Sequence, residues 1–183
     1  MNQHKPGDVL HPHDLTDIHG KPVRIPDAER LVHLQFRRYA GCPVCNLHLR
    51  SLAARHDEIV AGGISEVAVF HSRPETMLEF QGQLPFRVIA DPERRLYAEF
   101  GVGMMSPLVA LDPRSWRAAG RAISRAPSLR GARGRGEQHL GQPADFLIAP
   151  DGRILAVKYG QRVDDHWSVD DLLDLAGSRP VGG

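Results

Sequence analysis

The chain has 183 residues, of which 42% are hydrophobic and 25% charged, and its formal net charge is +1. This length suits one domain with a single core, and the near-neutral charge argues against nucleic acid or a membrane surface as the main partner. No apolar run approaches the roughly 18 to 20 residues that span a bilayer. The polar segment Met1–Asp14 lacks the apolar core of a secretory signal, which predicts a cytoplasmic protein.

The first half of the chain predicts a hairpin followed by alternating strands and helices. Apolar residues flank a His19-Gly20 turn in residues 9–25, which indicates a β-hairpin. Residues 31–36 predict a mostly buried strand, and apolar residues at helical spacing predict a helix from Pro43 to about Val60. After it we expect strands over residues 65–70 and 86–90, alternating with helices over 74–80 and 92–100.

The end of the chain predicts a second hairpin and a final helix. Strands are expected over residues 145–148 and 153–159, and Ser168 is a cap for a helix over residues 169–176. Together the elements indicate an α/β fold. We expect a central mixed sheet flanked by helices and an N-terminal β-hairpin, with residues 1–183 forming one domain.

An arginine-rich insertion, residues 104–140, interrupts this alternation. A helix is expected over residues 114–125, around Trp116 and Ile123, and a mobile loop over residues 127–136. The arginines could bind nucleic acid or another anionic partner. Trp116 is the only interleaved aromatic residue and the net charge is near zero, so we favour a solvated loop and do not expect nucleic acid as a partner. The arginines of this segment are Arg114, Arg117, Arg121, Arg125, Arg130, Arg133 and Arg135.

The chain contains two cysteines, Cys42 and Cys45, separated by Pro43 and Val44. Two neighbouring cysteines do not make a disulfide scaffold, and no second cysteine pair or His-x-x-x-His motif completes a zinc site. We therefore expect neither a metal nor a cofactor. A Cys-x-x-Cys pair between a strand and a helix is typical of a thioredoxin-like redox motif. The alternative is a pair of buried structural thiols.

The position of the pair favours thiol chemistry. Cys42 is expected at the cap of the helix that begins with Pro43, where unpaired backbone N–H groups and the helix dipole stabilise a thiolate. Cys45 lies one helical turn further on, within reach of a disulfide with Cys42. The preceding Arg37 and Arg38 are expected to lower the pKa of the thiols by their charge.

From about residue 7 to residue 177 the chain resembles the peroxiredoxin-like (AhpC/TSA) family of the thioredoxin-like superfamily. The resemblance rests on the order and spacing of loose segments. They are the opening Gly7–Ile25, Leu31–Cys45, Asp91-Pro92-Glu93-Arg94-Arg95-Leu96-Tyr97 with Phe100-Gly101-Val102, and the late hairpin Phe146–Arg153.

Two departures from that family are informative. Cys42 stands where a typical peroxiredoxin has the threonine of Thr-x-x-Cys, and Cys45 stands at its peroxidatic cysteine. Gln142-Pro143 replaces an arginine just before the late hairpin. This pattern resembles the peroxiredoxin-like 2 branch, which carries Cys-x-x-Cys.

The resemblance to thioredoxins implies further site residues. The Gln142–Pro143 peptide is then cis and faces the cysteine pair, with Gln142 offering its backbone to an incoming chain. Tyr159 and Gly160 end the paired strand and are expected to border the same surface, with Gly160 leaving room for a substrate backbone.

The function implied is that of a thiol–disulfide oxidoreductase or a thiol-dependent antioxidant protein. Cys42 attacks a disulfide or peroxide substrate and Cys45 resolves the product, while an external thiol reductant returns the electrons. If the peroxiredoxin alignment governs the chemistry, these roles are exchanged. The alternative is a redox-sensing or binding module on the same fold that does not turn over. A homo-oligomer is compatible with either function.

Overall fold

The computed structural model describes residues 2–108, 112–126, 132 and 139–178. Its strands are β1 (His13–Thr16), β2 (Pro22–Ile25), β3 (Leu31–Phe36), β4 (Ile64–Phe70), β5 (Arg87–Ala90), β6 (Ala144–Ile148) and β7 (Ile154–Tyr159). Its helices are α1 (Pro43–Ala54), α2 (His56–Ala61), α3 (Pro74–Gln81), α4 (Arg95–Glu99), α5 (Pro113–Ser124) and α6 (Val169–Gly177).

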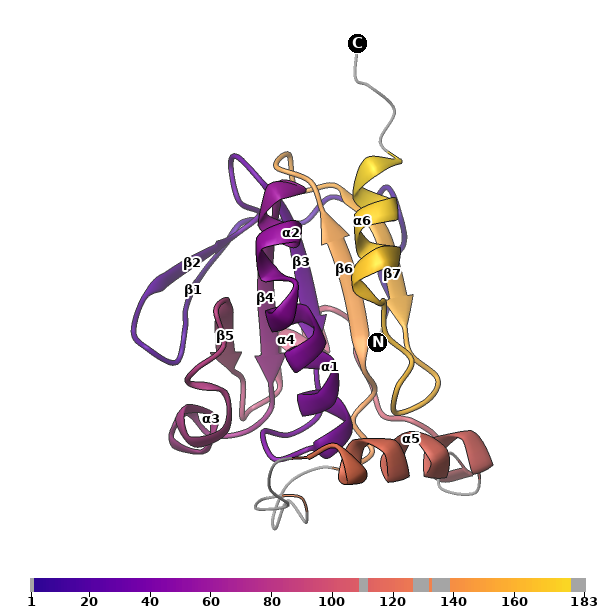
Figure 1. Ribbon diagram of the computed structural model, residues 1–183. Coiled ribbons are helices and arrows are strands. Elements are labelled where there is room, and N and C mark those ends of the chain that lie inside the picture. The colour runs from indigo at the N-terminus through magenta and orange to yellow at the C-terminus, as the bar shows by residue number, and fades with distance from the viewer. Residues whose placement is uncertain (1, 109–111, 127–131, 133–138, 179–183) are drawn as a thin grey trace.

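The centre of the fold is a mixed five-stranded sheet in the order β5-β4-β3-β6-β7 (Figure 1). Strands β3, β4 and β5 run parallel, whereas β6 is antiparallel to both β3 and β7. The β1–β2 hairpin forms a separate two-stranded sheet. The predicted α/β class, mixed sheet and N-terminal hairpin are confirmed.

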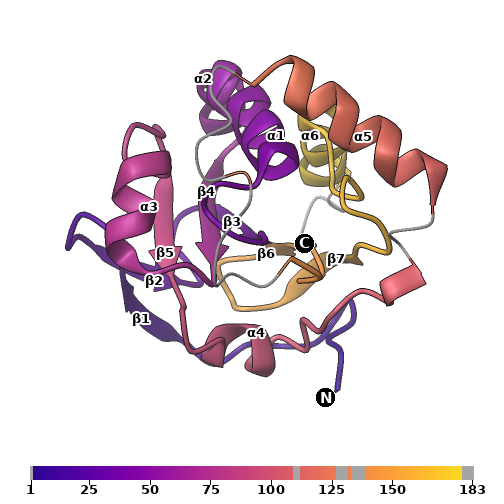
Figure 2. The same ribbon diagram turned by 90° about the horizontal axis from the view of Figure 1, so that it is seen from below.

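Helices cover both faces of the sheet and create two cores. Figure 2 shows α1, α2, α5 and α6 on one side and α4 on the other. The first core lies beneath α1 and α6 and includes Cys45 and Leu172, while the second lies beneath α4 and includes Phe36 and Phe146. Because successive side chains of a strand point to opposite faces, β3 contributes to both cores and is buried along its whole length.

Two predicted helices have different bounds in the structure. The helix expected from Pro43 to about Val60 breaks at Arg55, which has φ −118° and ψ 23° and ion-pairs through its guanidinium with Glu58 and Asp170. The helix expected over residues 92–100 begins only at Arg95. The carboxylate of Asp91 accepts hydrogen bonds from backbone N–H groups at that point, and Arg94 has the left-handed φ of 57°.

The insertion contributes no strand to the five-stranded sheet in its described residues, and it meets the β6 side only at an isolated bridge between Met104 and Gly141. Helix α5 packs on α1, and its small residues Ser115, Ala118 and Ala122 are buried. Its Trp116 is 67% exposed, so this residue lies outside the core. Except for Ala132, the loop expected over residues 127–136 lies outside the described residues. Within the described part of the chain, no helix is long and apolar enough to cross a membrane.

Candidate redox site

The two cysteines lie where the chain leaves β3 and enters α1. Cys42 is the N-cap of α1, and its Sγ accepts a hydrogen bond from the backbone N–H of Cys45 at 3.3 Å. Pro43 is the first residue of the helix, where a missing N–H costs no hydrogen bond. Both cysteines are free thiols, and they are 0% and 4% exposed, respectively. The sequence therefore places Cys45 on the buried side of the first turn of α1, next to Cys42.

The side chain of Arg38 lies directly against this pair. Its Nη2 donates to Cys42 Sγ at 2.9 Å, and its Nη1 donates to the carbonyl oxygen of His139 at 3.2 Å. The side chain also packs beside Gly141, where an added Cβ would lie 3.7 Å from Arg38 Cγ. The segment before β6, which includes His139 and Gly141, therefore holds the Arg38 guanidinium against the thiol pair.

The pKa values of the two thiols are shifted in opposite directions. Burial opposes ionisation of Cys45, but the hydrogen bond from the Cys42 thiol, the charge of Arg38, the backbone N–H of Arg38 and the charge of Arg37 together lower the pKa of Cys45 to about 5. Burial raises the pKa of Cys42 well above its usual range, and the charge on Cys45 acts in the same direction. The pair thus carries one negative charge near neutral pH. The guanidinium of Arg38 neutralises this charge and contacts Cys42 Sγ. Arg38 therefore stabilises a thiolate on either sulfur.

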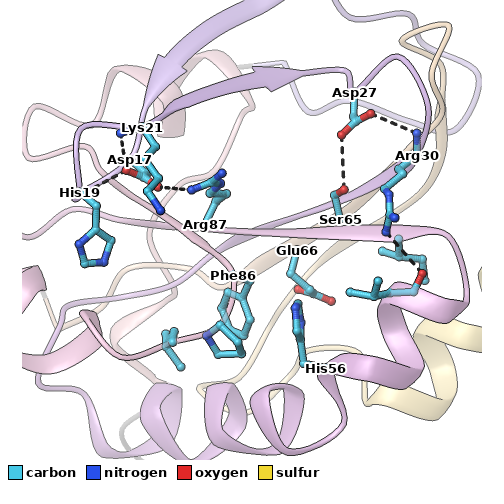
Figure 3. A pocket seen from close by; sticks show the side chains of 14 residues that line it. Asp17, His19, Lys21, Asp27, Arg30, His56, Ser65, Glu66, Phe86 and Arg87 are labelled. Carbon is cyan, nitrogen blue, oxygen red and sulfur yellow. Dashed lines mark hydrogen bonds and ion pairs between the residues drawn. The ribbon is translucent and has the colours of Figure 1, made fainter.

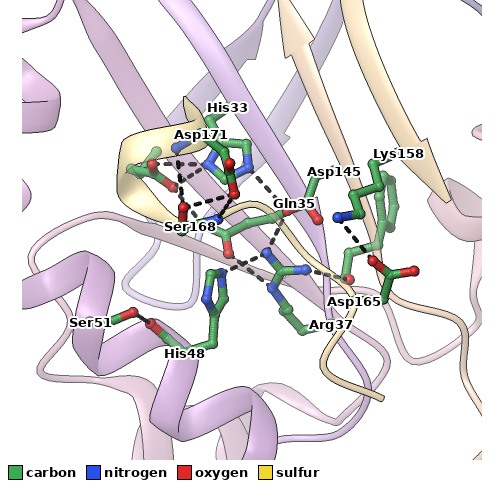
Figure 4. A network of polar contacts seen from close by, with 12 residues as sticks. His33, Gln35, Arg37, His48, Ser51, Asp145, Lys158, Asp165, Ser168 and Asp171 are labelled. Atoms are coloured by element: carbon green, nitrogen blue, oxygen red, sulfur yellow. Dashed lines mark hydrogen bonds and ion pairs between the residues drawn. The ribbon is translucent and has the colours of Figure 1, made fainter. Parts of the chain in front are cut away.

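The side chain of Arg37 lies in a buried polar network with Gln35, His48 and Asp145 (Figure 4). Its guanidinium donates to Gln35 Oε1 at 3.0 Å and to Asp145 Oδ1 at 2.6 Å, and its Nη2 lies 3.1 Å from His48 Nε2. The side chain is only 1% exposed. Arg37 therefore affects the thiols through its charge.

His33 lies at the centre of the same network. Its Nδ1 lies 2.9 Å from Glu66 Oε1, and its Nε2 lies 3.0 Å from Asp145 Oδ1. Burial alone would lower the pKa of His33, but the two carboxylates raise it to about 9. The charges of Arg37 and His33 hold the pKa of Asp145 well below its usual range, against the effect of burial.

Two further histidines close the network on its helical side. The rings of His48 in α1 and His166 before α6 stack with their centroids 3.6 Å apart. Burial and the neighbouring His166 and Arg37 lower the pKa of His48 well below its usual range. Burial and Arg37 lower the pKa of His166 to about 3. Both imidazoles are therefore neutral next to a charged Arg37.

The predicted cis peptide at Gln142–Pro143 is wrong. Among the described residues, the only cis peptide bond is Ile25–Pro26. Gln142 is held extended before β6, because its backbone N–H donates to Gly103 O at 3.1 Å and its side-chain amide donates to Gly160 O at 3.1 Å. A trans peptide bond is compatible with both hydrogen bonds. Because the backbone N–H of Gln142 is already bonded to Gly103, it is not free to pair with an incoming chain as in a thioredoxin.

Tyr159 and Gly160 also have partners within the protein. The Tyr159 hydroxyl accepts from His4 N at 2.8 Å and donates to Phe100 O at 2.7 Å, on the α4 side of the sheet. A Cβ added at Gly160 would lie 2.4 Å from Asp165 O and 2.7 Å from Pro143 Cγ. The missing side chain at Gly160 therefore accommodates the protein's own backbone, not that of a substrate.

The sequence analysis did not identify most residues of the buried polar network. It also did not identify Tyr97, whose hydroxyl donates to the carbonyl oxygen of Arg37. The missed residues are His33, Gln35, His48, Glu66, Tyr97 and Asp145. A signal existed in β3, where His33 and Gln35 are polar residues two positions apart in a strand that is buried throughout. Two buried polar side chains on one face of a strand need partners, so they predict polar residues on the neighbouring strands.

A polar pocket occurs elsewhere, between the β1–β2 turn, β5 and α2 (Figure 3). Three acidic residues line it, and one of them, Asp17, accepts from the backbone N–H groups of His19 and Lys21 at 2.9 and 2.8 Å and pairs with Arg87 at 3.0 Å. The pocket includes neither cysteine. Among the described residues, no group of three or more His, Cys, Asp or Glu side chains could hold a metal ion.

A family model described as "AhpC/TSA antioxidant enzyme" matches residues 49–162, which is more than half of the chain and begins after both cysteines. No curated protein sequence matches the chain.

Solved structures with the same fold include peroxiredoxins and a thiol:disulfide interchange protein. The peroxidoxin BcpB from Mycobacterium tuberculosis has a TM-score of 0.69 at 19% identity and covers 96% of this chain and 99% of its own. Peroxiredoxin Q from Xanthomonas campestris has a TM-score of 0.66 at 15% identity, covering 95% and 97%. A Chlorobium tepidum protein assigned as the thiol:disulfide interchange protein DsbE has a TM-score of 0.61 at 20% identity, covering 96% and 100%. At these identities the likeness establishes a thioredoxin-like fold.

Proposed function

Because the chain belongs to the family of AhpC/TSA antioxidant enzymes, we propose that Cys42 and Cys45 form its redox centre and cycle between a dithiol and a disulfide. One observation carries the proposal. Two adjacent free thiols lie at the start of a helix, and the buried guanidinium of Arg38 lies 2.9 Å from Cys42 Sγ. A stabilised thiolate next to a second thiol is the arrangement that thiol–disulfide exchange requires.

We assign the first attack to Cys45. Its pKa is lowered to about 5, whereas that of Cys42 is raised, and these directions favour Cys45 as the nucleophile. Cys42 is then the resolving thiol. This is the assignment that the peroxiredoxin alignment implied, and it reverses the order expected from a thioredoxin motif.

The chemistry balances for either class of substrate. With a hydroperoxide, the Cys45 thiolate takes the terminal oxygen to form a sulfenic acid and releases an alcohol; Cys42 then forms the disulfide and releases water. With a disulfide, Cys45 displaces one substrate thiol, and Cys42 displaces the other from the mixed disulfide. In both cases an external thiol reductant supplies two electrons and restores the dithiol.

The order of attack can be tested by trapping. The Cys42→Ser variant keeps the attacking thiol but cannot resolve its product, so a mixed disulfide with an aromatic disulfide probe should accumulate on Cys45. The Cys45→Ser variant should trap much less, and the Cys42→Ser/Cys45→Ser variant none. Mass spectrometry of the three variants measures this. Trapping by Cys45→Ser alone would reverse the assignment, and trapping by neither single variant would refute the redox centre.

The burial of both cysteines favours a second candidate function. Thiols that are 0% and 4% exposed meet substrates slowly, which suits a redox sensor that does not turn over. Assays of one preparation with hydrogen peroxide, an organic peroxide and an insulin-type disulfide, each with a dithiol reductant, distinguish the two. Multiple turnovers with any substrate support the enzyme. A single slow oxidation of the pair without turnover supports the sensor.

A further inference from the structure

The peptide bond between Arg37 and Arg38 is held by a hydrogen bond from Tyr97. The backbone N–H of Arg38 is one of the groups that lower the pKa of Cys45, because it favours the thiolate. The carbonyl oxygen of Arg37, which belongs to the same peptide unit, accepts a hydrogen bond from the hydroxyl of Tyr97. In a planar trans peptide the C=O and N–H bonds point in opposite directions. Fixing the carbonyl on the α4 side of the sheet therefore aims the N–H at the α1 side, where Cys45 lies.

Tyr97 has the rigidity that such a role requires. The residue is 1% exposed, and its ring packs against Phe36 with a centroid distance of 5.0 Å and an interplanar angle of 73°. Its hydroxyl also lies 3.0 Å from the carbonyl oxygen of Val69 in β4. At the other end of the residue, the backbone N–H of Tyr97 donates to Asp91 at 3.3 Å. Both ends of Tyr97 are thus fixed by the fold.

We propose that Tyr97 is a positioning residue of the redox centre, whose hydroxyl holds the Arg37–Arg38 peptide so that the Arg38 N–H donates to Cys45. This inference rests on the proposed function, in which Cys45 carries the thiolate. Burial, with the charges of Cys45 and Asp91, raises the pKa of Tyr97 well above its usual range. The hydroxyl therefore remains a protonated donor at every pH at which the thiols react.

The ionisable groups that face Cys45 come from three elements. Cys42 belongs to the same helical turn, Arg37 and Arg38 belong to the segment before α1, and Tyr97 belongs to α4. Three further ionisable groups lie near Tyr97 itself. The ring of His71 is 5.9 Å and the guanidinium carbon of Arg94 is 5.3 Å from the Tyr97 ring, and Asp91 accepts from the Tyr97 backbone N–H. Replacing the Tyr97 hydroxyl changes none of the formal charges in this set, so its effect on Cys45 reports the hydrogen bond.

The test is the pH dependence of Cys45 alkylation by iodoacetamide in the Cys42→Ser background. Tyr97→Phe removes the hydroxyl and keeps the ring. A loss of one hydrogen bond to a thiolate is expected to raise the thiol pKa by about one unit, which lowers the alkylation rate near the original pKa by about five-fold and leaves it unchanged near pH 9. Tyr159→Phe is the matched control, since its half-buried hydroxyl is also hydrogen-bonded, but to the N-terminal segment and Phe100.

A second substitution protects the test against a folding defect in Tyr97→Phe. Incorporation of 3-fluorotyrosine at position 97 keeps the hydroxyl and makes it a stronger donor, so alkylation at low pH should become faster. An unchanged pH midpoint in both Tyr97 variants, or a rate loss in Tyr97→Phe that is equal at all pH values, would overturn the proposal. Because alkylation requires no turnover, this result is independent of whether the pair proves to be an enzyme or a sensor.

Discussion

The charge of Arg38 is placed where it acts on the thiols with little screening by solvent. The residue is 9% exposed, and its Nη2 lies 2.9 Å from Cys42 Sγ. Replacement by methionine keeps an unbranched side chain and removes the charged guanidinium. An adjacent opposite charge typically shifts a pKa by about one to three units. We expect Arg38→Met to raise the pKa of Cys45 by about two units, which lowers the rate of Cys45 alkylation at pH 6 about ten-fold.

A neighbouring arginine provides the control for this substitution. Arg50 lies on α1, and its Nη2 donates to the carbonyl oxygen of Arg125 at 3.3 Å, away from the thiols. Arg50→Met should therefore leave the pH dependence of alkylation as it is in the unsubstituted protein. Equal pH profiles for Arg38→Met and Arg50→Met would show that the guanidinium of Arg38 does not stabilise the thiolate.

At the scale of residues, the partners in the buried polar network around His33 could not be predicted from the sequence pattern. His33 and Gln35 alternate along one face of β3, but their partners Glu66 and Asp145 come from β4 and β6. Glu66 lies opposite His33 because the hydrophobic faces of β3 and β4 set the register between these two strands. The sequence of either strand alone does not specify that register. The cysteine motif was recognisable because its chemistry is local, within one turn of α1.

At the scale of elements, α4 depends on one side chain for its position. The Asp91 carboxylate accepts from the backbone N–H groups of Arg95, Leu96 and Tyr97 at 3.0, 2.9 and 3.3 Å. Asp91→Ala should lower the free energy of unfolding by about 1–2 kcal/mol, which urea denaturation measures. Because α4 carries Tyr97, the same change should also slow Cys45 alkylation at pH 5.

The N-terminal cap of another helix separates these two effects. Asp112 caps α5 by accepting from Arg114 N at 2.9 Å. Asp112→Ala should also lower stability, by about 0.5–2 kcal/mol, but should not change the thiol pH profile. If both substitutions altered alkylation equally, the position of α4 would have no specific connection to the redox centre.

The elements themselves were largely predictable, and the exceptions have side-chain causes. The strand over residues 31–36 and the helix after Ser168 follow from local patterns. The structure contains the expected cap at Ser168, which forms a capping box with Asp171. The break at Arg55 and the late start of α4 depend on ion pairs and a carboxylate cap that local periodicity does not contain. The Gln142–Pro143 geometry depends on Gly103 and Gly160, which are distant in the sequence.

At the scale of the whole molecule, the buried histidines make stability depend on pH in opposite directions. His33 has a folded pKa of about 9, above the value of about 6.5 in an unfolded chain, so its contribution is fully present below pH 6.5 and is lost as the pH rises through 9. His48 and His166 have lowered folded pKa values, so their contribution is lost as the pH falls below 6.5. The three together favour a stability maximum near pH 6.5.

The ionisation of Cys45 counteracts the loss of stability on the alkaline side of this maximum. Cys45 has a folded pKa of about 5, below the value of about 8.5 in an unfolded chain, so it stabilises the reduced protein increasingly as the pH rises between these values. That gain opposes the loss from His33 over most of the same range. The reduced protein should therefore show a nearly flat stability profile between about pH 6.5 and 8.5.

Removing both thiols should expose the full effect of the histidines. In the Cys42→Ser/Cys45→Ser variant, we expect the free energy of unfolding to fall on both sides of pH 6.5, on the order of 1 kcal/mol per pH unit for each proton exchanged. Urea denaturation from pH 5 to pH 9 measures the profile. Adding His166→Gln should reduce the slope of the acid limb by about half, because His48 remains, and should leave the alkaline limb unchanged. An alkaline limb that stays flat after both thiols are removed would show that His33 is not charged between Glu66 and Asp145.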